Sequence, residues 1–182
     1  LSLKNYFKKK EIQESAEKIE MLNNLSPTLD AIYMKSIYKL NANRIMLMAY
    51  HNGQKIINGT PFSRQSAIKE VVDEDANTAL SADYFQSQIL TLYRFPQYVN
   101  THGKFMGTVE DVAKIDYKYK QQLQMHNINY IASKVIRIDG MTIGRITIGW
   151  EHGRTIPSPD KIENELNELI NETKSFVKIK LK

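Results

Sequence analysis

The sequence contains no cysteine. This absence excludes disulfide bonds, thiolate metal ligands, a cysteine nucleophile and thioether attachment of a chromophore. Glycine-rich phosphate loops, serine elbows, HExxH sequences and paired-carboxylate motifs are also missing, so the sequence does not indicate an enzyme of any class that they mark. We therefore expect a non-enzymatic protein that carries no cofactor and no metal.

The chain also lacks a run of about 18 apolar residues, so the sequence predicts no membrane-spanning helix. No secretory signal is visible, and a chain without cysteine fits a reducing compartment, so we expect a cytoplasmic protein. Because the sequence begins with Leu1 rather than Met, we expect a trimmed chain. Any membrane tether would then lie in a segment upstream of Leu1.

The sequence has few unbalanced positive charges outside its first ten residues. The formal net charge is +5, and four positive charges come from Lys4, Lys8, Lys9 and Lys10, with no acid among those ten residues. A basic segment confined to one end is typical of a solvated arm or a juxtamembrane segment. We therefore expect no nucleic-acid partner, because no aromatic and basic groove motif accompanies the charge.

Residues 134–150, KVIRIDGMTIGRITIGW, carry the strongest local pattern in the chain. Two β-branched runs flank Asp139-Gly140, and this dipeptide between apolar runs predicts a hairpin with a type I′ turn. Both strands are too apolar for a solvated hairpin, so we expect them mid-sheet with a helix over at least one face. The apolar positions change parity at Gly144, which predicts a β-bulge or the close approach of a helix.

The first part of the chain predicts two helices and a buried strand. Residues 4–24 have a thin apolar stripe near the seven-residue period, which fits either a solvated helix or a dimer seam. Ser26-Pro27 begins a second helix with a core-facing stripe at 3.6 spacing. Arg44–Tyr50 is apolar on both parities, as in a central strand. His51-Asn52-Gly53 then turns the chain toward a partner strand that begins at residue 55.

The remaining segments have less regular patterns of apolar residues, and each predicts a helix or a short strand. Residues 68–72 fit a short strand or a turn of helix, and residues 81–94 fit a helix that Phe95-Pro96 ends. Thr108 resembles the start of a capping box, and helical spacing continues from there to His126 as one helix. Ser158-Pro159 begins the last helix.

The resulting order is helix, strand, strand, variable helical region, helix, strand, strand, helix. This order resembles a GAF domain, the small-molecule sensor fold related to PAS, over residues 26–177. His51-Asn52-Gly53, Gly59-Thr60-Pro61-Phe62 and Glu70 also resemble a subset of GAF-like bacterial and phage proteins, some with a membrane-anchoring N-terminus. The resemblance implies an α+β fold in which helices flank a central antiparallel sheet.

We therefore expect two parts, an N-terminal helical extension over residues 1–25 and a GAF-like domain over residues 26–182. The resemblance implies a pocket without naming a ligand. GAF domains that attach bilins, and those that reduce free methionine sulfoxide, need cysteines that this chain lacks. The Asn-Lys…Phe…Asp-Glu series of cyclic-nucleotide-binding GAF domains is absent at a matching spacing.

The candidate ligand-binding residues come from the turn after the central strand, the loop that follows it, the aromatic middle of the chain and the end of the last strand. They are His51, Asn52, Pro61, Phe62, Glu70, Tyr84, Tyr93, Phe105 and Trp150.

Each candidate also has a purely structural interpretation. His51-Asn52-Gly53 fits a plain turn, Glu70 and Asp73 fit solvated carboxylates, and the aromatic residues fit a helix-on-sheet core. In a GAF-type sheet the first and last strands are neighbours, so His51, Glu151 and His152 are a weak alternative as a metal-ligand set.

Two functions fit these observations. The first is a sensory or regulatory module that binds an unidentified small molecule and signals through a helical dimer interface, by shifting a conformational equilibrium. The second is a ligand-free GAF-fold domain for protein–protein docking or assembly, phage-encoded and membrane-tethered in its full-length form. A pocket filled by the chain's own Tyr and Phe side chains favours the second. We expect a homodimer in the first case and a protein partner in the second.

Overall fold

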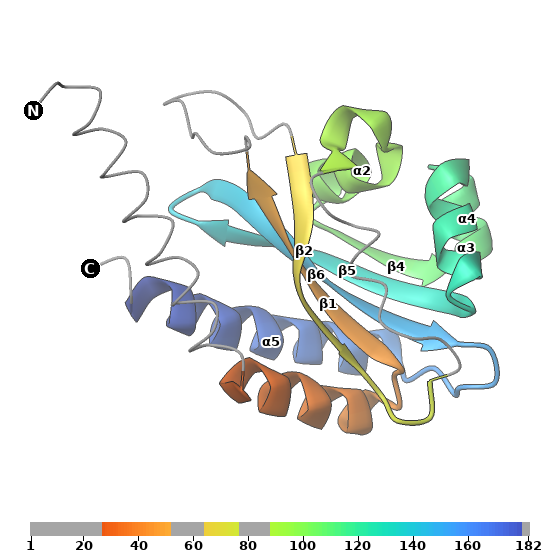
Figure 1. Cartoon of the computed structure of the whole chain (residues 1–182), viewed down its shortest axis with the longest axis horizontal. Helices are drawn as coiled ribbons and strands as arrows, with labels where there is room; N and C mark the ends of the chain where they lie inside the picture. Colours follow the sequence, from red (N-terminus) through yellow and green to blue (C-terminus); the bar gives the residue numbers. More distant parts are fainter. Residues whose placement is uncertain (1–26, 52–63, 77–87, 180–182) are drawn as a thin grey trace, which may run out of the picture.

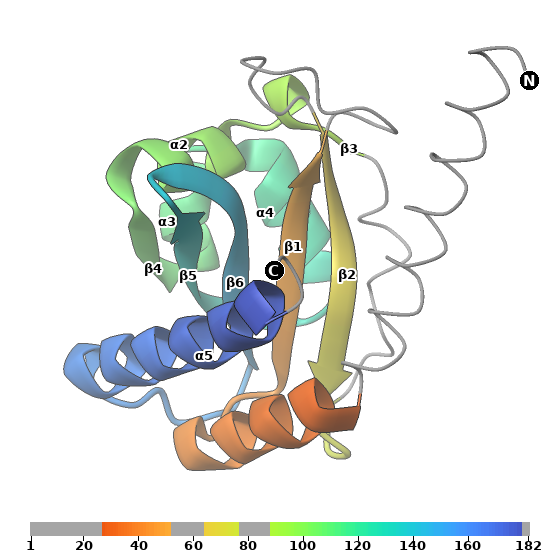
Figure 2. The same cartoon turned by 90° about the vertical axis from the view of Figure 1, so that its left-hand side faces the viewer.

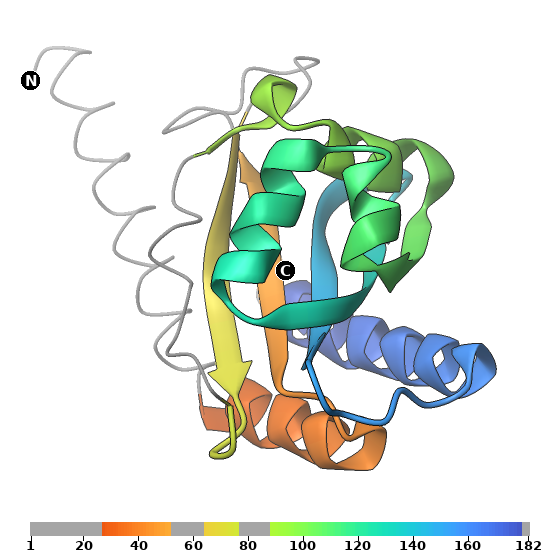
Figure 3. The same cartoon turned by 90° about the vertical axis from the view of Figure 1, so that its right-hand side faces the viewer.

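A computed structural model describes residues 27–51, 64–76 and 88–179. In these residues a six-stranded antiparallel sheet lies between two layers of helices (Figure 1). The helix of residues 27–40 and α5 (Pro159–Ile179) form one layer (Figure 2). The opposite layer, seen in Figure 3, consists of α2 (Arg94–His102), α3 (Val109–Ala113) and α4 (Tyr117–Met125). The predicted α+β class, with helices flanking a central antiparallel sheet, is confirmed.

The strands follow the order β3-β2-β1-β6-β5-β4 across the sheet. Their bounds are β1 (Arg44–His51), β2 (Arg64–Val72), β3 (Gln88–Ile89), β4 (Lys104–Thr108), β5 (Ile128–Ile138) and β6 (Met141–Glu151). A short 3₁₀ helix, η2 (Leu90–Leu92), leads from β3 toward α2. β1 and β6 occupy the centre, so the prediction of a central first strand and of its pairing with the last strand is confirmed.

The β5–β6 hairpin forms as its sequence predicts. Asp139 and Gly140 have φ values of 50° and 80°, which a type I′ turn requires. The register between the two strands shifts between Ile136 and Arg137, opposite Gly144, so the predicted bulge is confirmed. The element that approaches Gly144 is β1 rather than a helix. A Cβ placed on Gly144 would lie 2.2 Å from the carbonyl oxygen of Met48.

Side chains of the central strands alternate between two cores, as the period of two in a strand requires. One core lies against the helix of residues 27–40 and α5, and it receives Ile45, Leu47, Ile146, Ile148 and Trp150. The other lies against α2, α3 and α4, and it receives Met46 and Met48 from β1. Two separate apolar layers therefore cover the sheet, which is why β1 is apolar on both of its faces.

The region predicted as one helix between Thr108 and His126 is two helices. Thr108 forms the predicted capping box at the start of α3, with reciprocal hydrogen bonds to Asp111. Asp116 then interrupts the helical run. Its carboxylate accepts hydrogen bonds from the backbone N–H of Tyr119 at 3.0 Å and of Phe95 at 3.1 Å. The side chain therefore caps α4 and ties it to α2, which a prediction from helical periodicity alone does not detect.

The predicted helix end at Phe95-Pro96 is wrong, because α2 begins at Arg94. Pro96 lies in the first turn, where a missing N–H costs no intrahelical hydrogen bond. Residues 68–72 belong to a strand, β2. The helical predictions for residues 1–25 and 81–87 and the strand prediction at residue 55 lie outside the described residues.

The helix ends follow their capping residues. α5 begins at Pro159, and the Ser158 hydroxyl accepts a hydrogen bond from the Lys161 N–H at 3.4 Å, so that helix start is confirmed. The helix of residues 27–40 stops at Asn41, which has a φ of 53°. Among the helices in the described ranges, none combines the length and the apolar character needed to cross a membrane.

Candidate functional site

A pocket lies between α4 and the sheet, on the face covered by α2, α3 and α4. Its lining residues are Arg44, Met46, Tyr119, Leu123, His126, Ile128, Ile131, Thr147 and Gly149. The cavity has a volume of about 30 Å³, which is room for about two water molecules. An apolar wall with a few polar groups is the composition of a small-molecule site.

Local sequence places these groups around the pocket. Tyr119, Leu123 and His126 follow one another at spacings of four and three residues, so they share one face of α4 and of its C-terminal end. On the sheet side, Gly149 leaves room for the Arg44 side chain. A Cβ at that position would lie 3.1 Å from the Arg44 Cγ. The arginine therefore lies across β6 at the base of the pocket.

Arg44 is held by two buried carboxylates. Its Nη1 lies 3.0 Å from Glu70 Oε1, and its Nη2 lies 3.2 Å from Glu151 Oε1. The exposed fractions of the three side chains are 6%, 1% and 1%. Charges so deeply buried are tolerated only when they are paired, so each member of this cluster depends on the others. The three groups come from β1, β2 and β6.

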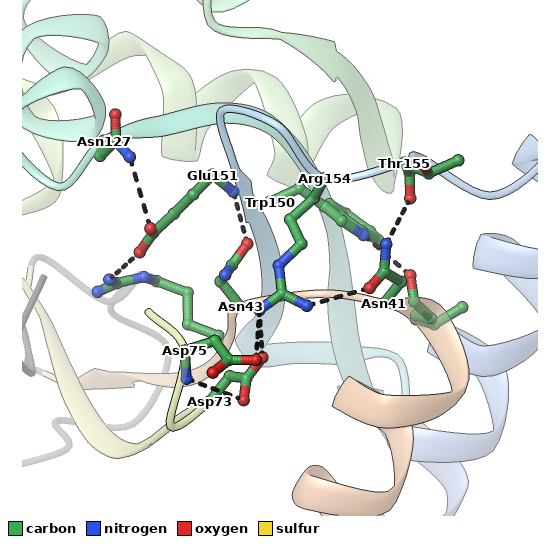
Figure 4. A network of polar contacts seen from close by, with 11 residues as sticks. Asn41, Asn43, Asp73, Asp75, Asn127, Trp150, Glu151, Arg154 and Thr155 are labelled. Atoms are coloured by element: carbon green, nitrogen blue, oxygen red, sulfur yellow. Dashed lines mark hydrogen bonds and ion pairs between the residues drawn. The ribbon is translucent and has the colours of Figure 1, made fainter. Parts of the chain in front are cut away.

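Asparagine side chains hold Glu151 in place. Figure 4 shows this carboxylate near Asn127, whose Nδ2 donates to Oε2 at 3.5 Å, while the backbone N–H of Glu151 donates to Asn43 Oδ1 at 2.7 Å. The same figure shows Arg154 beside Asp73, with 2.5 Å between Nη2 and Oδ2. This end of the sheet therefore carries two arginines, Arg44 and Arg154, each paired with at least one buried carboxylate.

The interpretation of Glu70 and Asp73 as solvated carboxylates is wrong. Glu70 is 1% exposed at its side chain and pairs with Arg44, and Asp73 is 6% exposed and pairs with Arg154. Both arginines come from distant parts of the chain. The neighbouring Lys69 pairs with Asp30 instead, so the partners of these acids are not visible in the local sequence.

His126 lines the pocket at the C-terminal end of α4. Burial lowers the pKa of its imidazole below the ordinary value of 6.5, and the positive charge of Arg44 lowers it further. The Glu70 carboxylate acts in the opposite direction without reversing the shift. The imidazole at the pocket wall is therefore neutral at neutral pH.

We expect His126 to make the protein less stable in mild acid. Its pKa is lower in the folded state, so the unfolded chain binds more protons between that pKa and about 6.5. The free energy of unfolding should therefore fall as the pH drops from 7 to 5. Urea unfolding of the wild type and of His126→Gln at several pH values measures this. The variant should show the shallower loss, and parallel curves for the two proteins would contradict the shift.

The structure separates the residues of the weighed metal-ligand set. β1 and β6 are antiparallel, with Ala49 opposite Gly144 and Arg44 opposite Gly149. His51 therefore lies at the end of β1 far from Glu151 and His152, and this set is wrong. In residues 27–51, 64–76 and 88–179, no group of three or more acidic or histidine side chains is placed to hold a metal ion.

The structure brings one predicted ligand residue to the edge of the pocket. Glu70 contacts Arg44, which lines it. Tyr93 lies beside α4, where its hydroxyl accepts a hydrogen bond from Gln122 Nε2 at 3.2 Å. Trp150 belongs to the opposite core, and its Nε1 donates to the Leu40 carbonyl at 3.0 Å.

Phe105 packs in the aromatic part of the core against α2. Its ring meets Phe95 edge-on at a centroid distance of 5.1 Å, and Phe95 stacks on Tyr119 at 4.5 Å. For Phe95 and Phe105 the structural interpretation as helix-on-sheet core is therefore confirmed. The remaining candidates Asn52, Pro61, Phe62 and Tyr84 lie outside the described residues, and for His51 only the backbone position in β1 is described.

Several pocket residues were not among the candidates from sequence: Arg44, Tyr119, His126 and Thr147. A usable pattern was present in β6. Its apolar residues Ile146, Ile148 and Trp150 share one parity, and the opposite parity carries Arg145, Thr147 and Glu151. Polar groups on one parity of a strand too apolar to be solvated indicate a buried polar face.

Comparisons with known proteins were made at the level of sequence and of structure. No protein-family model matches this chain, and no curated protein sequence matches it. The blue-light-absorbing form of the PixJ GAF domain of Thermosynechococcus elongatus is similar in structure, with a TM-score of 0.59 and 14% identity over 82% of each chain.

Two further solved structures are similar to this chain. A cyanobacteriochrome receptor PixJ structure has a TM-score of 0.62 and 15% identity, covering 89% of this chain and 99% of its own. The phycoerythrobilin-bound GAF domain of a cyanobacterial phytochrome has a TM-score of 0.59 and 12% identity, covering 97% and 96%. At such identities the likeness concerns the fold. This chain has a GAF-like fold.

Proposed function

We propose that this chain is a non-enzymatic sensory or regulatory module that binds a small molecule in the pocket between α4 and the sheet. The observation that carries the proposal is the pocket itself, an apolar space with Arg44, His126 and Thr147 in its wall. In this proposal, ligand binding biases the position of α4 and signals through a helical dimer interface. The ligand acts by its different affinity for two conformations.

The proposed ligand is smaller than a bilin. One structural neighbour is a phycoerythrobilin-bound GAF domain, but this chain has no cysteine for a thioether bond. The free space of about 30 Å³ accommodates a few non-hydrogen atoms while α4 stays in place. A compact molecule, or one arm of a larger molecule, fits this space.

One observation favours the alternative, a ligand-free docking domain. Tyr119 and Phe95 stack at 4.5 Å and are 4% and 0% exposed, so the chain's own aromatic side chains occupy much of the region between α4 and the sheet. A domain whose pocket is closed in this way would act through its outer surface. The presence or absence of a bound molecule distinguishes the two functions.

Native mass spectrometry of the purified full chain, compared with its denatured mass, tests the proposal. We expect a dimer that carries additional non-covalent mass. Leu123→Trp should lose this mass, because Leu123 lines the pocket and the larger side chain fills it. Met125→Trp is the matched control, since this residue of the same helix is 65% exposed and should retain the ligand.

The other outcomes are informative in different ways. Additional mass that persists in Leu123→Trp would place the ligand elsewhere and contradict the proposed pocket. A dimer without additional mass in all three proteins would favour the docking domain. A monomer in all three would remove the dimer interface from the mechanism.

A further inference from the structure

Arg145 is a fully buried guanidinium in the middle of the sheet. It lies on β6 opposite Met48 of β1 and Val135 of β5, and its exposed fraction is 0%. Its Nη1 donates to Gln65 Oε1 at 2.5 Å and to the Tyr50 hydroxyl at 3.4 Å. Both acceptors are neutral, so these bonds leave the charge of the guanidinium uncompensated.

Within the described residues, the other edge of the same guanidinium has no hydrogen-bond acceptor. Nε and Nη2 are both buried and lack a partner among the residues that the structure describes. These two nitrogens form the side-on edge of an arginine, where two N–H groups point in parallel. That edge matches the two oxygens of a carboxylate in a bidentate pair. A buried donor left without an acceptor costs free energy, and a charged donor costs more.

The groups around Arg145 keep it charged without neutralising it. Burial works against the charge, but the hydroxyl groups of Tyr50 and Tyr119 beside it raise the pKa of the guanidinium above its ordinary value. No ion pair between Arg145 and an acid occurs in the described part of the chain, in contrast to Arg44 with its two carboxylates. The site therefore holds a buried cation whose charge one anion would neutralise.

Arg145 is adjacent to the proposed ligand pocket. Tyr119 lines the pocket and also stands beside Arg145. Thr147, two residues along the same face of β6, lines the pocket as well, and its hydroxyl lies 2.8 Å from that of Ser133. Tyr119 therefore connects the pocket to Arg145.

We propose that the pocket takes a small carboxylate-bearing ligand whose carboxylate binds the Nε and Nη2 edge of Arg145. This inference rests on the proposed function and specifies the chemical class of the ligand. A singly charged carboxylate neutralises the one uncompensated charge, whereas a doubly charged phosphate would leave a net negative charge in a buried site. Binding requires Tyr119 to move aside, which couples the ligand to α4.

Thermal unfolding of the full chain in sodium acetate and in sodium chloride, at equal ionic strength and pH 7, tests the proposal. Acetate should raise the Tm of the wild type above its value in chloride, by about 3 °C once its concentration is tenfold above Kd. Arg145→Met should abolish this difference and unfold in chloride at the wild-type Tm or higher, because an unpaired buried charge has been removed. Arg145→Lys, which keeps the charge without the two-pronged edge, should show a smaller acetate effect.

Three results would overturn the proposal. The first is no difference between acetate and chloride for the wild type, and the second is an acetate effect that survives in Arg145→Met. The third concerns the five acids outside the described residues, which are Glu11, Glu14, Glu17, Glu20 and Asp83. If replacing them by amides couples to Arg145→Met in a double-mutant cycle, the chain's own carboxylate occupies the edge.

Leu123→Trp separates this inference from the proposed function. An acetate effect that is lost in Arg145→Met but kept in Leu123→Trp supports the carboxylate site and contradicts its connection to the pocket. Conversely, a native ligand whose mass is retained in Arg145→Met supports the pocket function and overturns the role of Arg145.

Discussion

Arg44→Met is expected to lower the free energy of unfolding by about 3–5 kcal/mol. The substitution keeps most of the side-chain volume but removes the cation between Glu70 and Glu151, whose side chains are each 1% exposed. Two buried carboxylates then face each other without the charge that compensates them. Urea unfolding monitored by circular dichroism measures the loss.

A rescue variant distinguishes the charge from the packing. Adding Glu70→Gln and Glu151→Gln to Arg44→Met should restore more than half of the lost stability, because the neutral amides no longer need a cation. Lys114→Met is the surface control. The Lys114 and Asp111 side chains are 75% and 43% exposed, so this change should leave the free energy of unfolding nearly unchanged. If the triple variant is no more stable than Arg44→Met, packing rather than charge explains the loss.

The second large effect is expected at Gly144. A Cβ there would lie 2.2 Å from the Met48 carbonyl oxygen, which belongs to the backbone of the neighbouring strand. Because a backbone carbonyl cannot rotate away as a side chain does, β1 and β6 must separate locally. We expect Gly144→Ala to lower the free energy of unfolding by about 3 kcal/mol, the upper end for overpacking.

Gly149→Ala is the matched control for this prediction. Both glycines lie on β6, and neither has a positive φ. The atoms nearest to a Cβ at Gly149 are side-chain carbons of Arg44 and Ile128 at 3.1 Å, which can shift. Its cost should be about 1 kcal/mol. Equal losses in urea unfolding of the two variants would show that the approach of β1 does not determine the need for glycine at 144.

Within the described residues, local sequence determined the starts of α3 and α5 and the central hairpin. Pro159 after Ser158 begins α5, and Asp139-Gly140 makes the hairpin turn, because these residues act on the backbone next to them. The order of such elements was enough to indicate the GAF-like fold. The absence of cysteine by itself excludes disulfide bonds and thiol chemistry, whatever the fold.

Only the tertiary structure decided the site. Arg44, Glu70 and Glu151 come together because β1, β2 and β6 are neighbours in one register, and a shift of one residue would turn each side chain to the other face. Because β1 and β6 run antiparallel, His51 and His152 lie at opposite ends of this strand pair.

Individual side chains form hydrogen bonds between elements that the periodicity of the sequence does not predict. Asp116 begins α4 as its cap, which divides a predicted single helix into two, and ties that helix to α2 through the Phe95 N–H. Arg145 was visible in sequence as a charged residue in an apolar strand. Its hydrogen-bond partners Gln65 and Tyr50 lie 80 and 95 residues away in the chain, and its Nε and Nη2 have no partner among the described residues. The sequence determined the elements, and long-range packing determined which polar groups were left to bind a ligand.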